Sequence, residues 1–265
     1  AQGVKIKAVI SKIENNFSLP KIENFEKLIS SKTKAILICN PGNPTGYLYN
    51  KKEIDQLAKL VKKHDLFLIA DEVYREFCYD GEKHHSIMSL DNLRNNAIMI
   101  DSVSKRYSMC GARIGCLITK NKEVYHTVMK FAQARLSPPS YAQIACEAAI
   151  DTPDSYFQEV VSEYTERRNF LVKELKKIPG VKVVNPKGAF YCIAELPVDD
   201  ADDFAKWLLR EFRVDNQTVM IAPAAGFYSS DNLGKNQIRI AYVLKKKDLM
   251  KSVNILKLGL KGYRN

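Results

Sequence analysis

Residues 97–105 read AIMIDSVSK, a short apolar run that leads directly into two serines and a lysine. An apolar run bounded by polar residues predicts a buried β-strand over 97–101. Lys105 is followed eight residues later by Arg113, within the segment GARIG. A lysine beside hydroxyls and an arginine suits a covalently held phosphate cofactor, because a cationic neighbour favours the neutral, nucleophilic amine. Ser102 and Ser104 would add hydroxyl donors to the phosphate. Taken alone, the segment is also compatible with an ordinary surface loop before a strand.

Two upstream segments repeat this arrangement. Residues 35–46 read AILICNPGNPTG, a strand-like run followed by a dense turn signal that puts Asn43 in a loop. Residues 66–74 read LFLIADEVY, so Asp71 is expected where a second buried strand ends, with Tyr74 just beyond it. Open α/β sheets present ligand groups at the carboxyl ends of their strands. Taken by itself, Asp71 fits a helix cap or a structural ion pair better than a catalytic group.

In combination, the motifs resemble those of the class I/II aminotransferases, which are fold-type I pyridoxal-phosphate enzymes. The resemblance rests on ordered segments at family-like spacings: NPTG at 43–46, DEVY at 71–74, SVSK at 102–105 with Arg113 and Gly115, and QIRIAY at 237–242. Within the family the chain looks most like the aspartate aminotransferase group. That finer resemblance rests on QARLSPP at 133–139 and APAAGFY at 222–228.

The resemblance implies pyridoxal 5'-phosphate as cofactor and gives each motif residue a role. Lys105 would form the internal aldimine and act as the general base. Asp71 would pair with the pyridine nitrogen and keep it protonated. Asn43 and Tyr74 would hydrogen-bond the 3′ oxygen of the ring.

The phosphate and the substrate would be held by further side chains. By resemblance, Ser102, Ser104 and Arg113 would bind the phosphate, and Arg239 would clamp the substrate α-carboxylate with its planar fork. An arginine at a strand edge, paired with a surface acid, is the alternative for Arg239. Arg135 lies near the place where the family holds the side-chain carboxylate of a dicarboxylate substrate. An ordinary arginine at a helix end is the alternative there.

The resemblance implies transamination between an amino acid, aspartate first, and a 2-oxo acid such as 2-oxoglutarate, in a ping-pong cycle. Alanine or aromatic amino acids remain open as donors. A function of another class is also open: a non-catalytic pyridoxal-phosphate-binding sensor domain of a transcription regulator. The family further implies a homodimer with active sites at its interface.

The expected fold is α/β. Residues 1–153 would form part of a three-layer αβα large domain with a mostly parallel sheet, and residues 154–265 a linker helix and a smaller α+β domain. Helices are predicted over 51–65, 123–135, 138–149, 154–177, 201–213 and 246–261, and later strands over 181–184, 189–195, 218–222 and 237–242. Because members of the family are substantially longer, we expect an N-terminal part of the large domain to be missing.

Composition narrows the class of protein. The net charge of +11 comes from lysines scattered on predicted helix faces with acids interleaved, so a nucleic-acid partner is not expected. No apolar run is long enough for a membrane helix, and no signal-like segment is present. The six cysteines are dispersed without a CxxC pair, which favours reduced thiols in a cytoplasmic protein. The adjacent His84 and His85 stand without metal-type partners in the sequence, so no metal site is expected.

Overall fold

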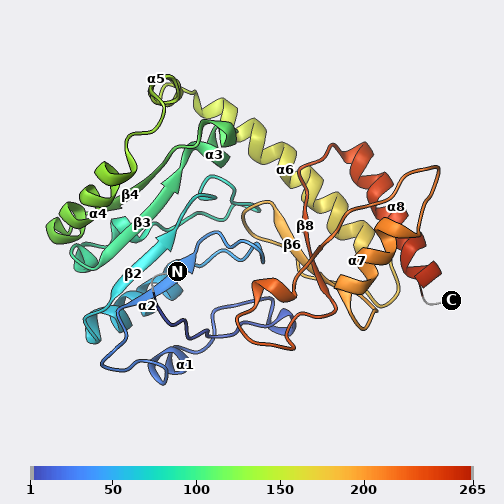
Figure 1. Ribbon diagram of the computed structural model, residues 1–265, viewed down its shortest axis with the longest axis horizontal. Coiled ribbons are helices and arrows are strands. Elements are labelled where there is room, and N and C mark those ends of the chain that lie inside the picture. Colours follow the sequence, from blue (N-terminus) through green and yellow to red (C-terminus); the bar gives the residue numbers. More distant parts are fainter. Residues whose placement is uncertain (1–2, 264–265) are drawn as a thin grey trace.

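Two separate four-stranded sheets organise the computed structural model, which describes residues 3–263 (Figure 1). The first sheet has the order β1-β2-β3-β4 and consists of β1 (Ala35–Cys39), β2 (Phe67–Asp71), β3 (Ala97–Ser102) and β4 (Gly115–Thr119). The strands β1, β2 and β3 pair in parallel, whereas β4 is antiparallel to β3. The carboxyl ends of the three parallel strands therefore meet at one edge of the sheet.

A helix between β1 and β2 covers one face of this sheet. Helix α2 (Lys51–Lys63) begins in a capping box, where the Asn50 side chain and the Glu53 backbone and side chain bond reciprocally. Its apolar stripe packs with alternate strand residues in one buried cluster: Ile38, Ile54, Leu57, Ala58, Val61, Leu66, Leu68, Ala70, Ile87, Leu93 and Ala97. Helix α1 (Ile22–Glu26) contacts α2, and its residue Phe25 packs against the cluster. On the other face Leu37, in the middle of β1, is 71% exposed.

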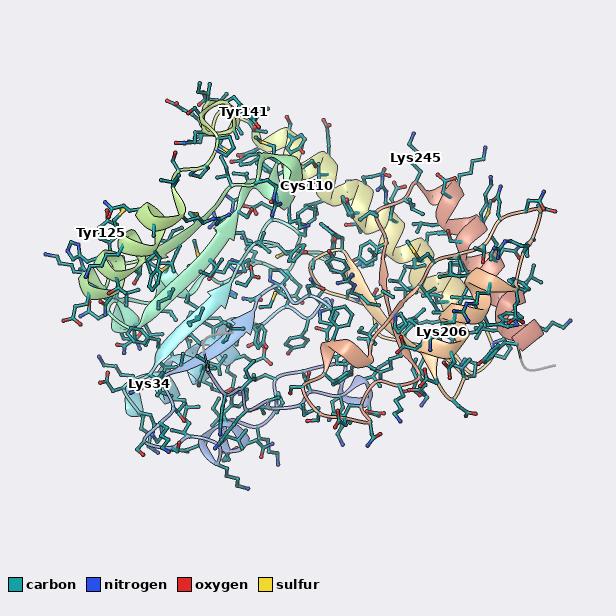
Figure 2. All side chains as sticks on the ribbon, viewed as in Figure 1. Lys34, Cys110, Tyr125, Tyr141, Lys206 and Lys245 are labelled. Atoms are coloured by element: carbon teal, nitrogen blue, oxygen red, sulfur yellow. The ribbon has the colours of Figure 1, made fainter. Side chains whose placement is uncertain are left out.

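A chain of helices leads away from the first sheet. Helix α3 (Val103–Arg106) follows β3 directly, and α4 (Lys122–Arg135) and α5 (Ser140–Ala149) follow β4. Both later helices are largely exposed, and their residues Tyr125 and Tyr141 project from the outer rim in Figure 2. Helix α6 (Asp154–Leu175) then crosses to the other half of the molecule (Figure 1).

The second sheet forms the core of the C-terminal half. Its order is β5-β6-β8-β7, all neighbours antiparallel, with bounds β5 (Lys182–Val183), β6 (Tyr191–Glu195), β7 (Ala222–Pro223) and β8 (Gln237–Ala241). Helices α7 (Ala201–Arg210) and α8 (Lys246–Tyr263) pack with α6 around it. Aromatic residues from the segment after β2, Tyr74, Phe77 and Tyr79, are buried in the same cluster. Short 3-10 turns lie at Ile13–Asn15, Ile87–Ser89, Asp91–Leu93, Cys110–Ala112 and Ala225–Phe227.

The structure confirms the α/β class with a mostly parallel sheet and a smaller α+β unit. Two short strands differ from expectation. The predicted strand 181–184 is reduced to Lys182–Val183, and that at 218–222 is wrong, because pairing with β8 begins only at Ala222. Both lie at sheet edges, where the position of one neighbour decides which residues pair. Residues 1–2 and 264–265, the outer ends of the two expected domains, lie outside the described residues.

Two glycines bring the two halves into contact beside the expected site. Gly46 has φ +69°, and a Cβ there would lie 2.2 Å from Pro186 Cβ. A Cβ on Gly188 would lie 2.5 Å from Pro41 Cβ and 3.0 Å from the Phe77 carbonyl oxygen. Only glycine permits so close an approach of backbones. The loop that carries Asn43 is therefore packed directly against the segment that leads into β6.

Candidate active site

Lys105 lies on a short helix that starts at the end of β3. The Ser102 hydroxyl caps this helix by accepting the Ser104 N–H at 3.1 Å, and it donates to the Ile114 carbonyl at 2.7 Å. Ser102 Oγ also lies 2.9 Å from Ser104 Oγ. The two serines thus present a pair of hydroxyls three residues and one residue before the lysine.

Aromatic rings surround the lysine amine. Lys105 Nζ lies 5.9 Å from the centre of the Tyr74 ring and 5.8 Å from that of Phe190. These rings meet edge to face, with centroids 5.1 Å apart. Within residues 3–263 no carboxylate pairs with the Lys105 amine. The amine is therefore held by ring faces rather than neutralised by an acid.

Tyr74 is buried between the two halves. Its hydroxyl donates to the Tyr191 hydroxyl at 3.1 Å. Burial and the neighbouring Tyr191 hydroxyl raise the pKa of Tyr74 above its ordinary value. Tyr74 therefore remains a neutral donor at physiological pH.

Asp71 ends β2 on the open face of the sheet. Its carboxylate accepts the Val73 N–H at 3.2 Å, and it lies opposite Cys39 in the parallel register. Burial raises the pKa of the Cys39 thiol to about 11, with a smaller contribution from Asp71. The neighbouring thiol therefore stays protonated, and Asp71 supplies the carboxyl group at this point of the edge.

Arg239 connects the second sheet to the first. From β8 its Nη1 donates to Asn43 Oδ1 at 3.1 Å, across 196 positions of sequence. Its guanidinium carbon lies 4.6 Å from the centre of the Tyr191 ring and 4.8 Å from that of Phe227. Its Nε is buried and has no hydrogen-bond partner among the described residues. The Tyr191 and Phe227 rings thus restrain the orientation of the guanidinium, and its Nε–H is available to an acceptor.

Arg113 and Arg135 do not join this group in the structure. Arg113 has left-handed backbone geometry, φ 58°, and its Nη1 donates to the Cys110 carbonyl at 2.9 Å. Cys110 marks this exposed loop in Figure 2. Arg135 is exposed at the last position of α4, and its side chain makes no hydrogen bond, ion pair or ring contact within residues 3–263. The described chain therefore brings together Asn43, Tyr74, Lys105 and Arg239, with Asp71, Ser102 and Ser104 along the same strand ends.

Sequence reasoning missed several residues around this group. Tyr191 and Phe227, which flank Arg239, were visible only as members of longer apolar segments. An ion-pair network next to Lys105 was also missed: Arg106 pairs with Asp101 at 2.6 Å and with Glu76 at 2.8 Å. No spacing signal marks these residues, because their partners come from different elements.

Two expected absences can be compared with the described residues. Within residues 3–263 no group of three or more His, Cys, Asp or Glu side chains could hold a metal ion. His84 Nε2 faces one acidic side chain, Glu72, at 3.6 Å, a contact between residues 12 positions apart that the sequence around His84 did not indicate. Over the same residues, no helix is long and apolar enough to cross a bilayer.

Comparisons with known proteins agree on one family. The family model for aminotransferase class I and II matches residues 1–255. An aspartate aminotransferase of Pyrococcus horikoshii is 31% identical over 255 residues, which cover 95% of this chain and 62% of that protein. An aromatic-amino-acid aminotransferase of Thermococcus litoralis is also 31% identical, over 94% of this chain and 62% of its own length. The chain thus spans less than two thirds of these curated relatives.

Solved structures show the same fold. The crystal structure of an aromatic aminotransferase from Pyrococcus horikoshii superposes with a TM-score of 0.85 at 29% identity, covering 96% of this chain and 66% of that one. Because the family model matches nearly the whole chain and the fold agrees, the chain belongs to the class I and II aminotransferases.

Proposed function

We propose that the protein to which this chain belongs transfers an amino group from aspartate to a 2-oxo acid such as 2-oxoglutarate, in a ping-pong cycle. The observation that carries the proposal is that an amine and a guanidinium border one cluster of rings, in which the Tyr74 and Tyr191 hydroxyls are hydrogen-bonded. An amine without a carboxylate partner, Lys105, lies against Tyr74, and a ring-clamped guanidinium, Arg239, contacts Asn43. An amino acid has both an amine to react and a carboxylate to grip.

The residues of the chain fit the family's cofactor. Class I and II aminotransferases use pyridoxal 5'-phosphate, whose aldehyde bonds an amine and whose ring withdraws electrons from the carbon that loses a proton. The serine hydroxyls beside Lys105 offer donors to a phosphate, and Arg113 would supply charge once it leaves the Cys110 carbonyl. Asp71 offers a carboxylate to the ring nitrogen. Each polar group of the cofactor thus has a complementary side chain at this sheet edge.

Each side chain then has a defined task. Asp71 holds a proton on the ring nitrogen, because an anion at hydrogen-bond distance stabilises the protonated form. Tyr74, which stays protonated, donates to the ring oxygen together with the Asn43 amide. Lys105 holds the cofactor covalently and, when free, carries a proton away from the substrate Cα. These tasks need no other acid–base group from the chain.

Substrate orientation is assigned to Arg239. Its fork can donate to a carboxylate in place of the Asn43 side-chain oxygen, and the two flanking rings keep it from rotating. Fixing the carboxylate at one end of the amino acid sets the direction of the Cα–H bond. For aspartate, Arg135 would bind the second carboxylate. Because Arg135 lies apart from the site of its own chain, it would have to act at the site of a partner protomer.

An aromatic amino acid is the second candidate donor. The Arg239 guanidinium lies between Tyr191 and Phe227, so apolar ring surface borders the place where a substrate would lie. The Thermococcus litoralis relative and the Pyrococcus horikoshii crystal structure are both named as aromatic aminotransferases. Ring surface favours a ring-bearing side chain.

We extend the proposal to assembly and place. A homodimer would bring Arg135 of one protomer to the site of the other, and the dispersed thiols fit a cytoplasmic protein. The division near residue 153 into a cofactor-binding part and a C-terminal domain follows the start of α6 at Asp154.

Labelling tests the proposal directly. Pyridoxal phosphate is added to the protein, borohydride reduces the adduct, and mass spectrometry locates the label; we expect it on Lys105. Lys122, on an exposed helix of the same half, is the control: a K122A variant should label normally and K105A should not. The full-length protein is then assayed with aspartate, alanine and phenylalanine against 2-oxoglutarate. A label spread over surface lysines, with no turnover, would refute the function.

A further inference from the structure

A second row of polar residues lies behind the candidate site. Because side chains alternate along a strand, three polar residues lie on the α2-covered face, opposite to Asp71. Asn40 and Glu72 directly follow β1 and β2, and Asp101 is the penultimate residue of β3. The exposed fractions of these three residues are 1%, 0% and 6%. Proposed catalysis uses none of them. Buried polar groups require hydrogen-bond partners, so the partners of these three side chains indicate their role.

Glu72 has a partner for only one of its oxygens. Oε1 accepts the Ile87 N–H at 2.9 Å. Oε2 faces His84 Nε2 at 3.6 Å, and in the described part of the chain neither of these atoms has a hydrogen-bond partner. The Asn40 side-chain nitrogen is likewise buried without a partner there. The His84 ring interacts in addition with the Asn40 backbone.

An acceptor facing an acceptor is repulsive unless one of them carries a proton. An ionised carboxylate at zero exposure, without a donor on Oε2, is costly because nothing replaces its hydration. A neutral carboxylic acid resolves this conflict, since Oε2–H can donate to a neutral imidazole. Burial acts in the same direction on both groups: it raises the pKa of Glu72 and lowers the pKa of His84 to about 4.

Other charged and polar groups around the pair do not remove the need for the proton. Those that face Glu72 or His84 are Arg75, His85, Ser86 and Asp101. The Ser86 side chain lowers the pKa of the Glu72 carboxyl, but burial, which is the larger effect, raises it. Arg75 and Asp101 lie 3.8 Å apart as an ion pair, and Asp101 also pairs with Arg106. Their charges therefore largely offset each other at the Glu72 carboxyl.

We propose that Glu72 and His84 hold one proton between them, carried on Glu72 Oε2 and donated to His84 Nε2. The resulting bridge joins the end of β2 to the Asn40 backbone at the end of β1. Asn40 begins the loop of Asn43, and Glu72 follows Asp71, so the pair positions the two loops that the candidate site needs. The proton assignment depends on the fold alone, whereas this positioning role rests on the proposed function.

The pH dependence of the unfolding constant shows how many protons the Glu72–His84 pair binds in the folded state. Between pH 4.5 and 6.5, the ordinary pKa values of the two groups, the unfolded pair binds about one proton, on His84. The folded pair also binds one, so it adds no pH dependence in this range. In Glu72→Gln the folded site binds none. Its unfolding constant relative to wild type should therefore rise about tenfold per pH unit as pH falls through this range.

The experiment is urea unfolding of wild type, E72Q and the control E82Q, followed by circular dichroism from pH 4.5 to 6.5. Glu82 lies in the same connecting segment but is exposed, so E82Q should track wild type. A constant ratio between E72Q and wild type would overturn the shared proton. Nitrogen NMR of His84 in the cofactor-free chain locates the proton; a neutral imidazole is expected at pH 6, and an imidazolium would overturn its placement on Glu72.

The positioning role has its own measurement. Glu72→Gln can still donate to His84 and accept from Ile87, whereas Glu72→Ala can do neither. Pyridoxal phosphate affinity of the full-length protein should fall severalfold in E72A and stay near wild type in E72Q. Equal losses in both variants would overturn the neutral bridge. If wild type itself does not bind the cofactor, the proposed function and the positioning role fail, while the unfolding and NMR results still decide the proton.

Discussion

Replacing Asp80 should destabilise the protein more than replacing Arg168, although the two residues form one ion pair. Arg168 of α6 is 1% exposed, and its guanidinium donates to both Asp80 oxygens, at 2.6 and 3.1 Å, and to the Pro186 carbonyl at 3.0 Å. The Asp80 side chain is 35% exposed and also pairs with Lys187 at 3.1 Å. The pair thus has one buried and one partly solvated member.

The difference in burial gives the size of the effect. Asp80→Ala leaves a buried guanidinium with neutral acceptors only, so it should cost about 3 kcal/mol, the lower end for breaking a buried pair. Arg168→Met leaves a carboxylate that water and Lys187 can satisfy, and methionine refills much of the buried volume. We expect a cost of about 1 kcal/mol. The double variant has no buried charge, so its cost should fall about 2 kcal/mol short of the sum.

Urea unfolding measures all three variants. Trp207, the only tryptophan of the chain, stacks on Phe204 and Phe212 and packs against the cluster of the C-terminal half, so its fluorescence reports unfolding where Arg168 lies. If the free energy of unfolding depends on urea concentration with the same slope in every variant, differences between the unfolding midpoints report differences in stability. A larger loss for Arg168→Met than for Asp80→Ala, or strict additivity in the double variant, would refute the reasoning.

Three further outcomes are expected. Gly188→Ala should destabilise by about 1–3 kcal/mol in urea unfolding, because its Cβ would overlap Pro41, whereas Gly226→Ala, with open space around it, should not. Arg239→Lys should raise KM for the amino acid about tenfold in the full-length protein, since lysine keeps the charge but loses the fork and ring contacts; an unchanged KM would contradict the carboxylate role. Hydrogen bonds from Arg168 lower the pKa of Asp80, so the stability it contributes is present above its ordinary value of 3.8 and lost as pH falls through the folded value. Asp80→Ala should therefore flatten the acid limb of the stability profile, and an unchanged limb would show that the pair is not responsible.

Local sequence patterns predicted the parts of the fold whose cause is itself local. Apolar runs that end in polar residues marked β1, β2 and β3, and α2 follows from its amphipathic stripe and capping box. The same patterns failed for β7, which starts at Ala222 although the predicted strand ends there. Strand β7 exists only where β8 offers backbone partners, and this condition is not written in its own residues.

Candidate-site residues divide in the same way. Asn43, Asp71 and Lys105 were predictable because each lies at the carboxyl end of a strand or within four residues beyond it, and parallel strands bring these ends to one edge whatever the loops do. Contacts between distant segments were not predictable: Arg239 with Asn43, 196 positions apart, the rings of Tyr191 and Phe227, and Asp80 with Arg168.

By itself, the sequence determined the family, the strand ends and the chemical groups at them, because periodicity and turn residues act over a few neighbouring positions. Only the tertiary structure decided which groups meet, which rings hold Arg239 and that Glu72 is buried opposite His84. Burial and pairing depend on how separate elements pack. A carboxyl that looks like surface in the sequence can therefore be forced to keep its proton when packing removes its water.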